Sequence, residues 1–162
     1  MKHFSLISKK DIFRARQKGA AAVEFAIVIS LLVLITGGII EFGRVLWYYD
    51  ALTKATRDGV RFMSTVPNDT ILSNITAAQN LVVNAANAAN VSPVLTLGNV
   101  SVTCQQAACQ NGVAPEYVKV AITEYSVTFG SWFPIPLPSG PLALTPYTTM
   151  RYMCDAGATT SC

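Results

Sequence analysis

The chain has 162 residues, of which 51% are hydrophobic and only 13% are charged, and its mean hydropathy is +0.39. This length leaves room for one globular domain at most. The net charge of +3 hides an asymmetry, because residues 1–19 hold six basic and one acidic side chain, whereas residues 20–162 hold six basic and eight acidic ones. The basic cluster directly precedes a long apolar run, so membrane topology explains it, and nucleic acid is disfavoured as a partner.

Residues 1–19 contain too little apolar sequence to form a core, and we interpret them as a cytoplasmic leader with basic residues at Arg14, Arg16 and Lys18. Positive charge beside a span keeps that side cytoplasmic, so the larger C-terminal part is expected across the membrane. The leader is either cut off after Gly19, retained as a topogenic tail, or removed as a conventional secretory signal. The last alternative is disfavoured, because a small-residue cleavage site would have to follow the apolar run.

Residues 20–40 form the predicted transmembrane helix, in which Glu24 is the one ionisable residue. As a helix they rise about 31 Å, which matches the hydrocarbon thickness of a bilayer. A carboxylate inside a span costs about 2.5 to 3.5 kcal/mol at the bilayer centre and less near its edge. We therefore expect a partner for Glu24, and a cut after Gly19 supplies one as the new α-amino group of Ala20 on a neighbouring copy.

The order of these features resembles the processing signal of type IV prepilins, in the version found in TadE-like pseudopilins of the Flp (tight adherence) pilus system. The resemblance consists of a basic leader, Gly19, four small or apolar residues, Glu24, Phe25 and an apolar helix. It continues through residues 39–64, which resemble the juxtamembrane helix of the family. It implies that a prepilin peptidase cuts between Gly19 and Ala20, and that Glu24 and Phe25 act in assembly.

The resemblance also implies a single-pass protein of the bacterial inner membrane, with a cytoplasmic N-terminus and a periplasmic C-terminal domain, which primes pilus assembly or enters the fibre. The implied partners are the prepilin peptidase, sibling pseudopilins, the major pilin, the inner-membrane assembly machinery and the lipid bilayer. The alternative is a membrane-anchored periplasmic binding module that keeps its leader. Glu24 distinguishes the two classes, because a simple anchor has no use for an acid inside the membrane.

Residues 41–66 are predicted to continue the span as an amphipathic juxtamembrane helix. Apolar residues recur there at spacings of three and four, as one helical stripe: Val45, Tyr48, Leu52, Ala55, Gly59 and Phe62. The aromatic run at residues 47–49 is expected at the membrane surface. Pro67 ends this helix, and a second helix over residues 70–89 is expected to fold back on the stripe as a helical hairpin.

Residues 67–162 are expected to form a periplasmic domain whose region 92–162 is β-rich and contains the cysteines. Segments rich in β-branched and aromatic residues predict three strands, at residues 94–104, 117–129 and 144–154. Packed on the helices as a small antiparallel sheet, they give an α+β, pilin-like fold. The proline-rich segment 130–146 is expected to be an extended loop that either docks or touches the membrane, or tucks under its own sheet.

All four cysteines lie in the far half of the chain, at Cys104, Cys109, Cys154 and Cys162. An even number in a translocated segment indicates disulfides. Of the three possible pairings, Cys104 with Cys109 and Cys154 with Cys162 are favoured, because both close short loops. A zinc site is the alternative, but the spacings fit it badly, and His3, the one histidine, lies on the other side of the membrane.

Catalytic constellations are missing from the sequence. With His3 confined to the leader, no Ser/His/Asp or Cys/His set can assemble in the translocated domain, and there is no phosphate loop or dinucleotide glycine motif. The scattered acids Glu116, Glu124 and Asp155 are interpreted as solvated surface groups. We therefore expect a protein that is not an enzyme and needs neither cofactor nor metal.

Overall fold

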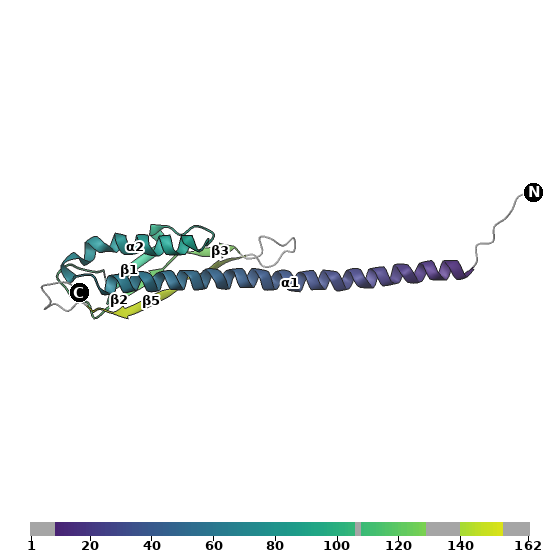
Figure 1. Cartoon of the computed structure of the whole chain (residues 1–162), viewed down its shortest axis with the longest axis horizontal. Coiled ribbons are helices and arrows are strands. Elements are labelled where there is room, and N and C mark those ends of the chain that lie inside the picture. Colours follow the sequence, from purple (N-terminus) through teal and green to yellow (C-terminus); the bar gives the residue numbers. More distant parts are fainter. Residues whose placement is uncertain (1–8, 106–107, 129–139, 154–162) are drawn as a thin grey trace, which may run out of the picture. The chain divides into compact units, whose positions relative to one another are not determined.

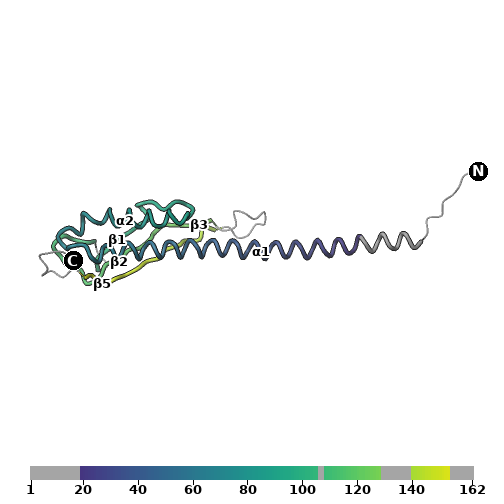
Figure 2. Tube along the Cα trace, viewed as in Figure 1, coloured from purple at the N-terminus to yellow at the C-terminus, as the bar shows by residue number. Residues whose placement is uncertain are grey.

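The computed structural model describes residues 9–105, 108–128 and 140–153, with side chains described from residue 19 onward (Figures 1 and 2). Its elements in chain order are α1 (Lys9–Ser64), the 3₁₀ turn η1 (Asn68–Thr70), α2 (Ile71–Ala88), η2 (Leu97–Asn99), β1 (Val100–Cys104), β2 (Tyr117–Ile122), β3 (Ser126–Thr128), β4 (Pro141–Ala143) and β5 (Tyr147–Arg151). The chain divides into two compact units, Met1–Phe42 and Gly43–Cys162, which are described separately.

Helix α1 begins at Lys9, before the glycine at which we predict processing, so part of the predicted leader is helical. Residues 9–18 contain neither glycine nor proline and consist largely of good helix formers, which explains the early start. The helix continues without a break through the apolar run and the amphipathic segment, and it ends at Ser64. Pro67 follows shortly, which confirms the predicted stop.

In the unit Gly43–Cys162, the predicted stripe of α1 faces the core. Its buried members are Val45, Tyr48, Leu52, Ala55 and Gly59, with Phe62 partly buried, and Thr56, Val60 and Met63 widen it. The prediction that the whole aromatic run lies at the membrane surface is wrong for Tyr48, which is only 8% exposed. Trp47 and Tyr49 remain outside, because they point away from the buried face of the helix.

Helix α2 packs against the C-terminal half of α1, as the predicted hairpin requires (Figure 1). The two helices approach closely at Gly59, where an added Cβ would collide with Cγ2 of Val82 and would lie 3.5 Å from Cγ1 of Val120. The buried side of α2 consists of Ile71, Ala78, Val82 and Ala86. A glycine in α1 therefore lets helix, helix and sheet meet at one point.

Three strands form an antiparallel sheet in the order β1-β2-β5, which confirms the predicted three-stranded arrangement. Alternate residues of β2 are fully buried, namely Val118, Val120 and Ile122. The Thr56 hydroxyl of α1 lies 2.9 Å from the Thr148 hydroxyl of β5, so the sheet is also tied to the helix by a hydrogen bond. The core of this unit is thus enclosed by α1, α2 and the sheet.

The strand bounds differ from the predictions in two places. The first strand starts at Val100, because Asn99 Oδ1 accepts hydrogen bonds from Thr96 N (3.2 Å) and Thr96 Oγ1 (2.6 Å) and closes a turn there. The second predicted strand is divided into β2 and β3 at Glu124, whose φ is 55°. A non-glycine residue at positive φ cannot continue an extended strand.

The proline-rich segment was expected to be a loop, but Pro141–Ala143 forms β4 and pairs antiparallel with β3. Pro141 is the first residue of a strand in a two-stranded ribbon, a position that does not require its missing N–H. The last predicted strand starts at Tyr147, after Pro146, which ends this segment. Residues 130–139 lie outside the described residues, so the docking and tucking alternatives stay predictions.

Cys104 and Cys109 form a disulfide, the pair favoured from the sequence, whereas Cys154 and Cys162 lie outside the described residues. The loop that follows this bridge reaches the start of α2, where Asn111 Oδ1 accepts a hydrogen bond of 2.9 Å from the amide of Leu72. Nearby, the amide of Gly112 donates to the carbonyl of Asn68 at 2.9 Å. The loop therefore supplies a cap for α2 from a distant part of the chain.

Two buried tyrosines fasten loops to the core. The Tyr125 hydroxyl donates to the Pro93 carbonyl at 2.7 Å, and the Tyr152 hydroxyl donates to the Val66 carbonyl. Burial raises the pKa of Tyr125 to about 12, with a smaller contribution from Tyr48. Burial also raises the pKa of Tyr152, with a smaller contribution from Asp69. Both phenols are thus held in the neutral form that can donate a hydrogen bond.

Candidate assembly helix and processing site

The predicted processing site lies within α1, and both Gly19 and Ala20 are exposed. Apart from its own helix backbone, no atom of the described residues lies within 4 Å of the place that a Gly19 Cβ would occupy. The bond is helical, and a protease that binds extended substrate must unwind the turn. Glycine makes that unwinding about 1 kcal/mol easier than alanine would. The basic residues Arg14, Arg16 and Lys18 precede it on the same helix, but their side chains are outside the described part.

Glu24 and Phe25 are exposed on α1, and Phe25 is 66% exposed. Glu24 follows Ala20 by four residues, so both lie on one face of the helix. The structure thus places the predicted assembly acid one helical turn after the predicted cleavage point, whereas Phe25 lies about 100° further round the helix.

The other polar side chains of the apolar run bond to their own helix. The Ser30 hydroxyl donates to the Ile27 carbonyl, and the Thr36 hydroxyl donates to the Leu32 carbonyl, both at 2.8 Å. Such internal bonds satisfy a hydroxyl group without water, so these residues are compatible with a lipid environment. Glu24 is consequently the residue of this run whose charge requires a partner from outside the helix.

The apolar run of α1 presents large side chains on all sides. Between 41% and 68% of each is exposed, for Val23, Phe25, Ile27, Val28, Ile29, Leu31, Leu32, Val33, Leu34, Ile35, Ile39 and Ile40. A helix that is apolar all round belongs in lipid or in a bundle of helices. Within the described residues, one helix is long and apolar enough to cross a membrane, and its most apolar window has a mean hydropathy of 2.5 with none of it buried.

The family model described as TadE-like protein matches residues 19–61. Residues 19–61 are thus similar to TadE-like proteins, and we call them the TadE-like segment. The match begins at Gly19, includes Glu24 and Phe25, and ends inside the C-terminal half of α1, so the resemblance inferred from these residues is confirmed. Neither the curated proteins nor the solved structures include one that matches the chain.

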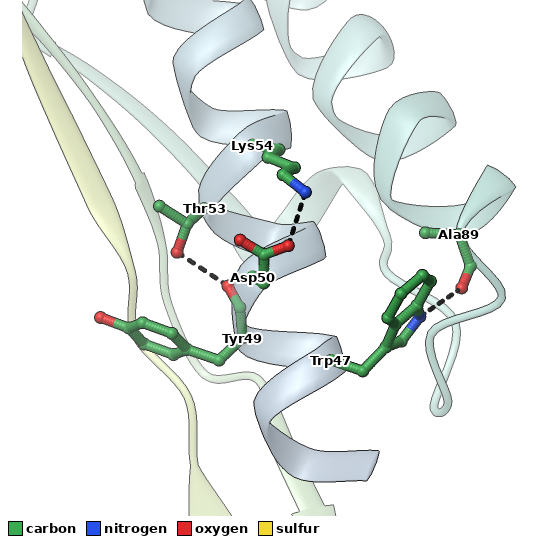
Figure 3. Close-up of polar contacts among 6 residues, drawn as sticks. All are labelled: Trp47, Tyr49, Asp50, Thr53, Lys54 and Ala89. Carbon is green, nitrogen blue, oxygen red and sulfur yellow. Dashed lines mark hydrogen bonds and ion pairs between the residues drawn. The ribbon is translucent and has the colours of Figure 1, made fainter. Parts of the chain in front are cut away.

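The TadE-like segment makes two hydrogen bonds that the sequence did not predict. Arg44 Nη2 donates to the Thr128 carbonyl at the end of β3 (3.0 Å), and the Trp47 indole N–H donates to the Ala89 carbonyl at 3.3 Å (Figure 3). Both hydrogen bonds join residues far apart in the chain, which helical periodicity cannot reveal. One turn along the helix, the Arg44 guanidinium also lies 5.6 Å from the ring centroid of Tyr48.

One ion pair lies on the exposed side of this segment. Asp50 and Lys54 are 2.6 Å apart, at the i, i+4 spacing that favours such pairs on a helix (Figure 3). Both side chains are more than half exposed, so the pair contributes little to stability. It leaves the buried face of α1 free for α2 and the sheet.

Proposed function

We propose that this protein is a pseudopilin, or minor pilin, that acts in the assembly of a Flp-type (tight adherence) pilus. One observation carries the proposal: Glu24 is exposed in an otherwise apolar helix, one turn after the Gly19–Ala20 bond at which the TadE-like match begins. An acid in such a helix is unfavourable for an anchor, but it is useful to a subunit that must find a defined neighbour. The proposed role is structural and not enzymatic.

In the proposed pathway, a prepilin peptidase cuts after Gly19, and the mature subunit is stored in the inner membrane with the unit Gly43–Cys162 in the periplasm. The cut gives Ala20 a positively charged amino group at the membrane edge. This amine on one subunit pairs with the Glu24 carboxylate of its neighbour, whether a sibling pseudopilin or the major pilin. The apolar surface of α1 suits lipid before assembly and neighbouring helices afterwards.

The ion pair sets the axial register of the subunits. For two unit charges in contact at about 4 Å, a slip of one helical turn adds about 5.4 Å and reduces their attraction to less than half, whatever the dielectric constant. A single acid is therefore sufficient to specify position along the helix.

The processing step is tested by the intact mass and N-terminal residue of the protein isolated from its native membrane. We expect a chain that begins at Ala20, and one that begins at Met1 or near Glu41 contradicts the proposal. The variant Gly19→Leu should remain uncut. Gly43→Leu is the matched control, because Gly43 is also an exposed glycine of α1 with no atom within 4 Å of its Cβ position, and this variant should be cut normally.

The assembly step is tested with Glu24→Gln and Glu24→Leu, which remove the charge in a polar and an apolar form. Both variants should be processed and retained in the membrane but should fail to support piliation. Ser30→Ala is the control, since it removes a polar group whose hydrogen bond stays within its own helix. Normal piliation with Glu24→Leu would instead favour a membrane-anchored binding module.

A further inference from the structure

The globular unit has one end at which few charged residues lie. This end is the one at which α1 enters at Gly43. Residues 89–99, 126–128 and 140–143 lie there and contain no Asp, Glu, Lys or Arg, and the charged residues Arg44 and Glu124 lie beside them. At the other end, where α1 stops, the chain places Arg61, Asp69, Glu116 and Arg151. The charge distribution therefore distinguishes the two ends.

The end of the unit at which α1 enters exposes large apolar side chains. Trp47 is 62% exposed, Val94 67% and Leu142 43%, and we call these three residues the anchor-proximal surface. They come from α1, from the loop after α2 and from β4, so no single amphipathic element produces them. Exposed apolar groups gathered from three elements indicate a surface that meets something other than water.

Hydrogen bonds fix these three elements at the same end. The Trp47 indole N–H donates to the Ala89 carbonyl, which places the C-terminus of α2 beside the first turns of α1 in this unit (Figure 3). The Tyr125 hydroxyl donates to the Pro93 carbonyl, and the amide of Leu144 donates to the Tyr125 carbonyl at 2.8 Å. The residue before Val94 and the strand that carries Leu142 are thus tied to a common tyrosine.

The chain connection keeps this end near the apolar run. Arg44, the second residue of this unit, donates to the Thr128 carbonyl, so the end of β3 lies beside the point at which α1 enters the unit. Gly43 follows Ile40 by only three residues. If residues 20–40 span the membrane, the chain therefore enters this unit within the polar layer, which is about 5 to 8 Å thick on each side of a bilayer.

We propose that the anchor-proximal surface rests on the headgroup layer of the lipid bilayer. The inference depends on the membrane anchoring in the proposed function and adds a second contact with the membrane. Trp47 suits that layer, because its ring is apolar and its N–H is polar. Arg44 and Glu124, the charged residues beside this surface, carry opposite charges, so this contact does not require anionic lipid.

Single-tryptophan reporters in the full-length chain test this surface. With Trp47 and Trp132 replaced by Phe, Val94→Trp or Leu142→Trp is introduced, and the protein is placed in phosphatidylcholine nanodiscs whose acyl chains are brominated near the headgroup. Both reporters should lose fluorescence about twofold relative to unbrominated lipid, because bromines near the headgroups lie close to side chains in the headgroup layer. Leu72→Trp is the matched control and should be unaffected, since Leu72 is 47% exposed but lies in the first turn of α2.

A charge introduced on the surface should break the contact. Val94→Glu should abolish the quenching of the Leu142→Trp reporter, whereas Leu72→Glu should leave it unchanged. Equal quenching at all three reporter positions, no quenching at Val94 and Leu142, or quenching that appears only with anionic lipid would each overturn the proposal. Retention of the protein in membranes after carbonate washing measures the anchor separately, so retention without quenching refutes this surface alone, and loss of retention refutes the anchoring itself.

Discussion

Replacement of Gly59 by Ala tests the close approach of α1, α2 and the sheet. The new Cβ would lie within 3.0 Å of Cγ2 of Val82, a residue that is fully buried and whose branched side chain has one preferred rotamer in a helix. Overpacking of this kind costs about 1 to 3 kcal/mol, and the better helix propensity of alanine returns up to about 1 kcal/mol. We expect a net loss of about 1 to 2 kcal/mol, or roughly 4 to 8 °C in Tm for a domain of this size.

The assay is thermal unfolding of the full-length protein in detergent, followed by circular dichroism. Gly43→Ala is the matched control and should be neutral or stabilising, because no atom lies near its Cβ position. Val82→Ala should be less harmful in the Gly59→Ala background than in the parent, by about 1 kcal/mol, since it removes the colliding methyl group. A Gly59→Ala variant that unfolds at or above the parent Tm, with no coupling to Val82, would show that this contact is not close.

Three further predictions concern the same domain. Asn111→Ala should lower its stability by about 0.5 to 2 kcal/mol in urea unfolding, because the first turn of α2 loses its side-chain cap, and an unchanged midpoint would contradict that role. Replacing Cys104 and Cys109 by Ser should lower the free energy of unfolding by about 2 kcal/mol in the same assay, as expected for a disulfide that closes a short loop. Reduction of the parent protein should have a similar effect unless a second disulfide contributes. The contribution of Tyr125 and Tyr152 to stability should be fully present below pH 10 and should be lost between pH 10 and about 12. The folded state raises their pKa values above the ordinary value of 10.0, so unfolding in this range releases their protons. A plot of Tm against pH should therefore be flatter in this range for Tyr125→Phe.

The helices were the most predictable part of the fold. A repeat of three and four residues fixes which side of α1 is buried, so Leu52 and Ala55 were correctly assigned to the core. The same repeat settles the position of Tyr48, whose aromatic character alone suggested the membrane surface. Where periodicity and residue type disagree, the direction of the side chain from the helix decides.

The strands were predicted less well, because local side-chain bonds and backbone conformations altered their limits. Asn99 closes a turn on Thr96 and delays β1, and the positive φ of Glu124 separates β2 from β3. Residue type did not predict either feature. Pro141 contributed to the wrong prediction of a loop for another reason. Proline is excluded from central strands, but it is tolerated at the start of an edge strand such as β4.

For the candidate site, composition was enough to select Glu24 and the apolar run, and the resemblance to prepilin signals selected Gly19, since these features are local in sequence. The contacts of Arg44 with Thr128 and of Trp47 with Ala89 were not predictable, because each joins residues that only the folded chain brings together. The anchor-proximal surface has the same origin. Its members look unremarkable one by one in the sequence, and they form a surface only at one end of the domain.

The helical backbone of α1 crosses the bond between Gly19 and Ala20, and this continuity has a consequence for the mature subunit. In the intact helix, the amides of residues 20–23 donate to carbonyls of residues 16–19, all of which depart with the leader. Cleavage would therefore leave an unsatisfied, electropositive helix end at the rim of the membrane. A carboxylate one turn away, from the same subunit or the next, is the natural acceptor for that end, so the acid would compensate for backbone donors as well as for the new amine.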